Sequence, residues 1–339
     1  MTIIPKQDFC KSCKNGEGFS IQLIPESADA TPFLPVAVIT GPTAVGKTAL
    51  ALQVAQELGA EIVSADSLQV YRELDIGSAK PTQEERALTP HHLIDVVFPD
   101  EDFDAAAYCR RGRRVLAELH ARRVPPLVVG GTGLYIRALL YGIFNDGVQD
   151  KTIRQHLQEE LAIQGLPVLY DRLRLLDPET AQRLHPHDAF RIQRALEVIA
   201  ATGQKMSELR QRHRFANNPY RVLKIALVRP REELYARIDC RVEAMLASGL
   251  VAEVQDLLKR YSPRLKSLQS LGYRHIGGFL QGYLSWEEAV AQLKRDTRRY
   301  AKRQLTWLRS EPDIHLLEPS QISAALKRLD LFFGSWSCC

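Results

Sequence analysis

The sequence has no apolar run approaching the roughly 18 residues of a membrane-spanning helix, and its first residues lack the apolar core of a secretory signal. Internal repeats and low-complexity tracts are also missing. These absences argue against the integral-membrane, secreted and repeat classes of protein. We therefore expect a cytoplasmic protein without a membrane partner.

The six cysteines form neither a disulfide framework nor a complete metal motif. A cytoplasmic setting argues against disulfides. Cys10 and Cys13 have the spacing of half a zinc site, but no second Cys-x-x-Cys or His-x-x-x-His pair completes it. Half a zinc site and an incidental pair both stay open, and the missing half favours the incidental pair. The other cysteines are Cys109, Cys240, Cys338 and Cys339.

Length and composition indicate an ordinary globular chain. Its 339 residues are 45% hydrophobic and 25% charged, which is enough to bury one large core or two smaller ones. The net charge of +5 identifies no partner by itself, because the clustering of the charges matters more than their sum.

Strands and helices alternate along much of the chain. Short apolar runs predict strands at 35–40, 61–67, 123–133 and 221–229, and apolar residues at four-residue spacing predict a helix over 48–58. Such alternation is typical of a parallel α/β sheet. The resulting segments are a disordered extension (1–34), a first core part (35–148), an inserted helical domain (149–220), a second core part with a basic C-terminal helix (221–320) and a tail (321–339).

A phosphate-binding loop joins the first strand to the first helix. Residues 41–48 fit G-x-x-x-x-G-K-[ST], in which backbone N–H groups and the helix N-terminus face an anion. Lys47 suits a terminal phosphate and Thr48 suits Mg²⁺. The sequence thus predicts a P-loop NTPase-like parallel sheet flanked by helices, with an inserted helical domain. The residues expected to hold a diphosphate or nucleotide are Gly41, Pro42, Thr43, Ala44, Val45, Gly46, Lys47 and Thr48.

Two further loops should meet this phosphate loop, because ligands of open α/β sheets lie beyond the carboxyl ends of the strands. Asp66 and Ser67 follow the second strand, and Thr132 lies in the glycine turn after the third. Asp66 can hold Mg²⁺ or take a proton, or it can merely cap a helix. Glycine and threonine stand where many P-loop NTPases have an Asp that organises Mg²⁺ and water, so an ATPase is disfavoured.

Basic residues cluster on the expected helix 293–309. An arc of one charge sign, backed by apolar residues, favours binding of nucleic-acid phosphates over a solvated face or a membrane surface. Arg241, on an earlier helix, falls beside an apolar stripe and needs a partner, for which a carboxylate and a phosphate are equally open. The basic arc consists of Lys294, Arg298 and Lys302 in one line and Arg295, Arg299 and Arg303 in the next.

Taken together, these motifs resemble the tRNA dimethylallyltransferases, also called tRNA isopentenyltransferases. The resemblance covers about residues 35–315. It rests, in chain order, on "GPTAVGKTALA", "DSLQVYRELDIGSAKPT", "LVVGGTGLYIRALL", "DPETAQRLHPHDAFRIQRALEV", "SLGYRHI" and "AKRQLTWLR". The departures are minor: Ser78 and His187 stand where the family commonly has Thr and Asn.

The resemblance implies transfer of a dimethylallyl group from dimethylallyl diphosphate to the exocyclic N6 of the adenosine 3′-adjacent to the anticodon of a tRNA. It implies that Asp66 takes the amine proton, that Thr132 and Arg241 hold the diphosphate, and that Mg²⁺ binds at Thr48 and Asp66. The helical insertion would clamp the anticodon stem-loop of the tRNA, and we expect a monomer. The residues implied to contact tRNA are Asp66, Ser67, Leu68, Gln69, Arg154, Phe190, Arg191, Ile192, Gln193, Arg194, Gly272, Tyr273, Arg274, Lys302, Arg303, Gln304, Trp307 and Arg309.

Three alternatives remain at this point. An adenylate isopentenyltransferase, which prenylates free nucleotides, would share the phosphate loop and Asp66 but would not need the basic helix. A P-loop small-molecule kinase would turn over ATP. A non-catalytic RNA-binding protein would not need Lys47, Thr48, Asp66 and Thr132 together.

Overall fold

The computed structural model describes residues 33–142, 151–213 and 219–337. The predictions for residues 1–32, including Cys10 and Cys13, and for Cys338 and Cys339 lie outside these ranges. Among the described residues, no helix is both long enough and apolar enough to cross a membrane.

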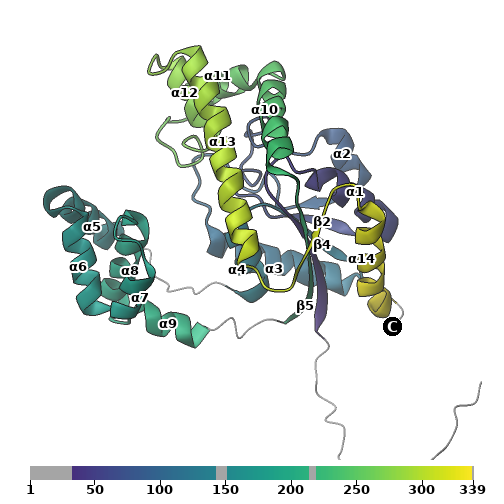
Figure 1. Ribbon diagram of the computed structural model, residues 1–339, viewed down its shortest axis with the longest axis horizontal. Coiled ribbons are helices and arrows are strands. Elements are labelled where there is room, and N and C mark those ends of the chain that lie inside the picture. Colours follow the sequence, from purple (N-terminus) through teal and green to yellow (C-terminus); the bar gives the residue numbers. More distant parts are fainter. Residues whose placement is uncertain (1–32, 143–150, 214–218, 338–339) are drawn as a thin grey trace, which may run out of the picture. The chain divides into compact units, whose positions relative to one another are not determined.

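A six-stranded parallel sheet lies at the centre of the described core (Figure 1). The spatial order is β3-β2-β4-β1-β5-β6. This confirms the predicted parallel α/β fold with flanking helices. The strands are β1 (Leu34–Thr40), β2 (Glu61–Ser64), β3 (His91–His92), β4 (Pro126–Gly130), β5 (Tyr220–Leu227) and β6 (Ile314–Leu317).

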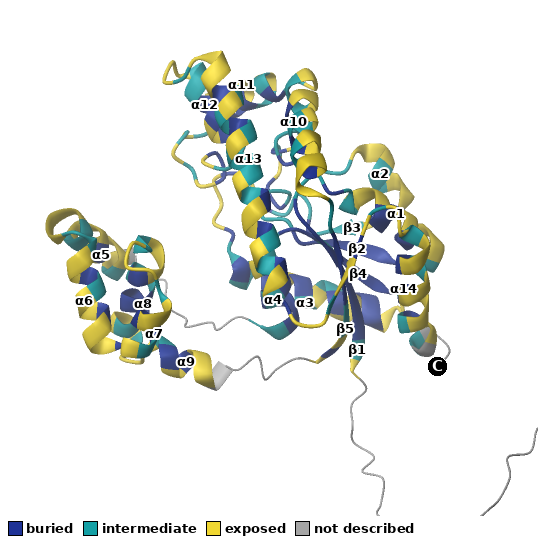
Figure 2. Ribbon diagram, in the orientation of Figure 1, coloured by how far each residue is buried: buried dark blue, intermediate teal, exposed yellow. Residues whose placement is uncertain are grey.

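Both faces of the central strands β1, β2 and β4 are buried, as Figure 2 shows. Along β1 the side chains alternate: Val36 and Val38 pack in one cluster, Ala37 and Ile39 in the other. Helices α3 and α4 cover the first face, and α1 and α14 cover the second (Figure 1). These four helices are α1 (Lys47–Leu58), α3 (Ala105–Ala121), α4 (Gly133–Tyr141) and α14 (Ile322–Ser337).

Helix α14 takes up most of the segment 321–339, for which the sequence predicts a tail. Ala325, Leu329 and Phe333 recur every four residues and are buried against the sheet. This four-residue spacing is present in the sequence, but the polar residues between the apolar ones make it hard to recognise. The remaining helices of the core are α2 (Gln83–Leu88), α10 (Arg231–Ala247), α11 (Leu250–Arg260), α12 (Tyr273–Leu280) and α13 (Trp286–Arg309).

The segment between α4 and β5 contains helices with a core of their own. Leu157, Leu169, Leu173, Ile192 and Leu196 are buried together within it. A hydrophobic cluster of this kind is what a separately packed helical unit requires. Its helices are α5 (Lys151–Gln164), α6 (Leu166–Leu176), α7 (Pro178–Arg183), α8 (Ala189–Thr202) and α9 (Met206–His213).

Candidate active site

The phosphate loop curls between β1 and α1 as its glycines predict. Gly41 has a φ of 148°, and a Cβ there would lie 2.7 Å from the carbonyl oxygen of Leu227. Gly46 has a φ of 110° and stands at the N-cap of α1. Only glycine adopts such conformations cheaply. The helix N-terminus therefore opens onto the loop, as an anion site requires.

Lys47 lies within the loop rather than in solvent. Its Nζ donates to the carbonyl oxygens of Gly41 at 3.0 Å and Pro42 at 2.8 Å. Burial and the nearby Arg241 cation lower the pKa of Lys47 to about 8, while the Asp66 carboxylate opposes the shift. The loop thus concentrates positive charge that has no full counter-charge of its own.

Arg241 projects from α10 beside Lys47 and Asp66. Its Nε is buried and has no hydrogen-bond partner among the described residues. Burial lowers the pKa of Arg241 from its ordinary value, and the charge of Asp66 works against that shift. Within the described residues no carboxylate forms an ion pair with Arg241, which favours the phosphate alternative over the carboxylate one.

Asp66 follows β2 by two residues and turns the chain. Its Oδ1 accepts from the backbone N–H of Leu68 at 2.8 Å and from that of Gln69 at 3.4 Å. The capping role foreseen for Asp66 is therefore present locally. It uses Oδ1 alone in the described contacts, so Oδ2 is left for a metal or a proton.

The glycine turn after β4 lies against the loop that contains Asp66. A Cβ on Gly130 would come within 2.2 Å of the Ala65 carbonyl oxygen, so the two loops approach backbone to backbone. Thr132 Oγ1 accepts from the Ser67 N–H at 3.1 Å. The hydroxyl of Tyr300 hydrogen-bonds Thr132 as well, and burial together with the Asp66 charge raises the pKa of Tyr300 to about 12.

Gln304 on α13 fixes the distance between two of these loops. Its Oε1 accepts from the Thr43 N–H at 2.9 Å, and its Nε2 donates to the Gly131 carbonyl at 2.9 Å. A Cβ on Gly131 would lie 2.2 Å from that Nε2, so glycine is needed for the contact. No sequence pattern signals this link, because Thr43 and Gln304 are 261 residues apart in the chain.

Two arginines hold the outer side of the phosphate loop. Arg229 donates through Nε to the Val45 carbonyl at 3.0 Å, and Arg237 donates to the Ala44 carbonyl at 2.9 Å. Sequence reasoning missed both residues as part of the site. They orient the loop carbonyls outward, which leaves the N–H groups facing the interior.

One cavity of about 550 Å³ joins these elements. The residues from 43 to 69 that line it include Lys47, Thr48 and Asp66. Arg241 and Gln304 face it from α10 and α13. Thr132 is not among the lining residues of the described chain and meets the cavity through Ser67 and Tyr300.

The cavity occupies a position that the sheet topology explains. The three loops follow β1, β2 and β4, which are neighbours in the order β2-β4-β1. Since all strands are parallel, their carboxyl ends open at the same edge. Three loops that are far apart in sequence are thereby brought to one place.

The sequence profile of the IPP transferase family matches residues 69–311. This chain belongs to that family. The match spans the glycine turn, α10 and α13, and it begins after the phosphate loop and Asp66. The predicted family is thereby confirmed.

Relatives extend the match to most of the chain. The tRNA dimethylallyltransferase of Syntrophobacter fumaroxidans is 52% identical over 297 residues, covering 87% of each chain. That of Desulfatibacillum aliphaticivorans is 50% identical over 298 residues, covering 88% of this chain and 97% of its own.

Solved structures support the same family membership. The tRNA isopentenylpyrophosphate transferase of Bacillus halodurans matches with a TM-score of 0.66 and 35% identity, over 89% of this chain and 97% of its own. A eukaryotic dimethylallyltransferase acting on tRNA matches with a TM-score of 0.73 and 30% identity, over 88% and 78% of the two chains.

Several tRNA contacts that the family resemblance implied have side chains directed elsewhere. Tyr273 is 1% exposed, and its hydroxyl donates to Glu253 at 2.7 Å. Gln304 is also buried, with its amide committed to the two loops. Ile192 has no exposed surface because it packs in the core of the helical segment. The side chains of these three residues are thus engaged within the protein, and their assignment as tRNA contacts stays a prediction.

Trp307 packs at the start of α4. A Cβ on Gly133 would lie 2.3 Å from its ring, and the Arg137 guanidinium lies 5.8 Å from the ring centroid. Its buried Nε1 has no partner among the described residues. The neighbouring Lys302, Arg303 and Arg309 are exposed and form no ion pair with a described carboxylate.

The two basic lines of α13 are not equivalent. Lys294 pairs with Glu243, and Arg298 pairs with Asp239 at 2.6 Å, so the first line turns toward α10 over most of its length. Lys294 and Arg298 are therefore engaged in ion pairs within the chain. In the second line, Arg295 and Arg299 share Asp296, which also accepts from Arg274.

The tRNA contacts expected in the helical segment lie on and beside α8. Phe190 is 80% exposed, so its ring is accessible to a partner. Arg154 and Arg194 both pair with the buried Glu197. Arg191 pairs with Asp188, and Gln193 donates to the Leu157 carbonyl.

Proposed function

We propose that this chain transfers the dimethylallyl group of dimethylallyl diphosphate to N6 of the adenosine 3′-adjacent to the anticodon in tRNA, releasing diphosphate. Membership of the IPP transferase family supports the activity. The single observation that carries the mechanism is the cavity in which Lys47 and Arg241 face Asp66. Cations for a leaving diphosphate and a base for an incoming amine thus share one chamber.

The diphosphate is held by the loop N–H groups, Lys47 and Arg241 in this proposal. Arg241 has a buried, unpartnered Nε, and such a group is stabilised when an anion reaches it. As the bond from C1 to the bridging oxygen breaks, charge develops on the diphosphate. Donors that are already in place stabilise that charge without reorganising.

Mg²⁺ would be held by Thr48 and Asp66. The donor set fits, because Mg²⁺ keeps several waters and is usually bound through one or two carboxylates together with substrate phosphates. Among the described residues no group of three or more His, Cys, Asp or Glu side chains forms a self-sufficient metal site. When bound, the ion would offset the charge of the leaving diphosphate.

Asp66 acts as the base toward the amine. N6 forms its bond to C1 as the C1–oxygen bond breaks, and the excess proton on N6 passes to the carboxylate. The Leu68 and Gln69 N–H groups both bind Oδ1, so the carboxylate is oriented and Oδ2 can accept that proton. Thr132, which hydrogen-bonds the Ser67 N–H and the Tyr300 hydroxyl, helps to hold the loop of Asp66 beside the cavity.

The tRNA would be bound by exposed basic residues of α13 and by the helical segment around Phe190. The target adenosine must leave its stack to enter the cavity. We propose that the helical segment clamps the anticodon stem-loop, and that the protein acts as a monomer in the cytoplasm.

The deciding experiment incubates the purified chain with unmodified tRNA, dimethylallyl diphosphate and Mg²⁺, without any nucleoside triphosphate. Mass spectrometry of the digested tRNA should find a prenylated adenosine next to the anticodon. Parallel reactions replace tRNA by AMP or supply ATP. Prenylated AMP without modified tRNA would establish the adenylate isopentenyltransferase instead, and ATP consumption would establish a kinase.

A second prediction concerns the basic surface. The logarithm of the tRNA association constant falls linearly with the logarithm of the salt concentration. Replacing Lys302 and Arg309 by Ala should make this slope shallower by roughly 0.7–0.9 for every phosphate that is no longer neutralised. The rate at saturating tRNA should hardly change. Lys294→Ala is the matched control, because Lys294 already pairs with Glu243. Equal slopes in the double variant and the unmodified protein would remove these two residues from the tRNA interface.

A further inference from the structure

One wall of the cavity is built from two short segments that contain little charge. Gly77, Ser78 and Ala79 form one side, and Ser270, Leu271 and Gly272 form the other. The cations of the cavity come from the phosphate loop, α10 and α13 instead. A small, uncharged wall suits a flat nucleobase better than a diphosphate.

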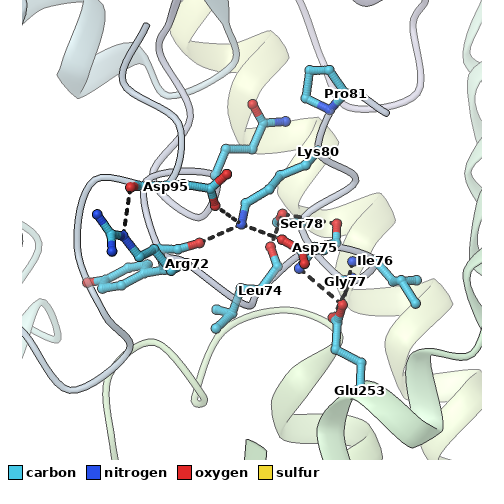
Figure 3. A network of polar contacts seen from close by, with 12 residues as sticks. Arg72, Leu74, Asp75, Ile76, Gly77, Ser78, Lys80, Pro81, Asp95 and Glu253 are labelled. Atoms are coloured by element: carbon cyan, nitrogen blue, oxygen red, sulfur yellow. Dashed lines mark hydrogen bonds and ion pairs between the residues drawn. The ribbon is translucent and has the colours of Figure 1, made fainter. Parts of the chain in front are cut away.

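The Asp75–Gly77 turn behind this wall is held by a single carboxylate. Glu253 on α11 accepts from the N–H groups of Asp75 at 3.1 Å, Ile76 at 2.7 Å and Gly77 at 3.1 Å (Figure 3). The same carboxylate accepts from the Tyr273 hydroxyl at 2.7 Å. Four donors therefore converge on one charged group, which makes each bond stronger than a neutral one.

Tyr273 ties the second segment to the first. Its ring is fully buried at the start of α12, and a Cβ on Gly77 would lie 2.6 Å from that ring. Burial and the Glu253 charge raise the pKa of Tyr273, so its hydroxyl remains a donor. The backbone of the turn at Gly77 thus packs against the Tyr273 ring. Because Tyr273 directly follows Gly272, this contact joins the two segments of the wall.

Lys80 fixes the far end of the turn. Its side chain is only 2% exposed, and its Nζ lies 2.6 Å from each of three acceptors: the Tyr71 carbonyl, Asp75 and Asp95 (Figure 3). With both ends held, the Glu253 bonds decide where the middle of the turn lies. Neither Glu253 nor Lys80 lines the cavity itself.

We propose that Glu253 is a positioning residue that sets the width of the nucleobase end of the cavity by holding the 75–77 turn against Tyr273. This inference rests on the proposed function. The base must present N6 to C1 in a reactive geometry, and a misplacement of about 1 Å can cost roughly 10²-fold in rate. Glu253 therefore acts on the rate of transfer, although it touches no substrate.

The test is Glu253→Gln. The amide keeps the size of the side chain, but its NH₂ group cannot accept from backbone N–H groups. With both substrates saturating, the single-turnover rate should fall by about 10- to 100-fold. The dissociation constants for tRNA and for dimethylallyl diphosphate should stay within about twofold, because the phosphate contacts that dominate binding are elsewhere.

Two further variants make the result decisive. Asp256→Asn changes an exposed carboxylate on the same helix, which forms an ion pair with Lys259, and should keep the full rate. Tyr273→Phe keeps the ring and three of the four donors to Glu253, so its rate should fall in the same direction but less. If Glu253→Gln does not fold, Tyr273→Phe decides alone.

A purely structural role for Glu253 would give a different pattern. The melting temperature would drop, while the rate per active site, counted by stoichiometric tRNA binding, would stay at the unmodified level; that result overturns the proposal. Inactivity of the unmodified protein toward tRNA would instead refute the proposed function. The two failures are therefore distinguishable.

Discussion

Asp66→Asn should lower the single-turnover rate by about 10²–10⁴-fold, the usual contribution of a positioned general base. The amide oxygen of Asn can still accept from the Leu68 and Gln69 N–H groups, so the local turn should persist. The change removes the carboxylate charge, and with it both the basic site and the expected Mg²⁺ contact. Binding of dimethylallyl diphosphate should continue through Lys47 and the loop N–H groups, and binding of tRNA through the basic surface.

The measurement combines rapid-quench single turnovers with filter binding of both substrates. Asp104→Asn is the matched control, since Asp104 accepts from the Ala107 N–H at 2.8 Å in a similar cap and lies outside the cavity lining. A nearly normal rate in Asp66→Asn would reduce Asp66 to a cap or a dispensable metal contact.

Arg241→Gln should lower turnover by at least about 10²-fold, the scale for removing one charge-stabilising donor. Because Arg241 has a buried, unpartnered Nε and no described carboxylate as an ion-pair partner, its removal leaves no orphaned charge. The free energy of unfolding should therefore change by less than about 1 kcal/mol. Turnover assays and thermal melts in parallel test both halves of this prediction.

Arg231→Gln provides the comparison, because Arg231 lies on the same helix and is exposed. It should keep both activity and stability. If Arg241→Gln melts early while its remaining folded molecules turn over normally, Arg241 serves the fold and the assignment to the diphosphate fails.

The parts of the site that could be predicted from the sequence are local. The glycine loop, Asp66 and the glycine turn each follow a strand, and parallel strands bring such loops to one edge. Gln304, Arg229 and Glu253 could not be found this way. Their contacts join residues 261, 184 and 176 positions apart, and no spacing rule connects a side chain to a distant backbone group.

The features that the sequence did not reveal have a shared physical cause. Tyr273 and Ile192 lie within segments that the family resemblance implied to be near tRNA, but whether a single side chain is buried depends on its own packing contacts. The four-residue apolar spacing that predicted α1 is also present in α14, but the polar residues between the apolar ones make it hard to recognise there. The pairing of Lys294 and Arg298 with α10 depended on tertiary packing, which a helical wheel of α13 alone does not contain.

The lowered pKa of Lys47 couples ligand binding to proton uptake. With a pKa of about 8, roughly half of the molecules have a neutral Lys47 amine at pH 8. A bound diphosphate stabilises the ammonium form and raises that pKa, so each binding event near pH 8 takes up a fraction of a proton. Affinity for the diphosphate should consequently be highest below pH 8 and should decline as pH rises through the free-state pKa, by up to about tenfold per pH unit until the bound-state pKa is reached. The heat of binding will also depend on the ionisation enthalpy of the buffer that supplies the proton.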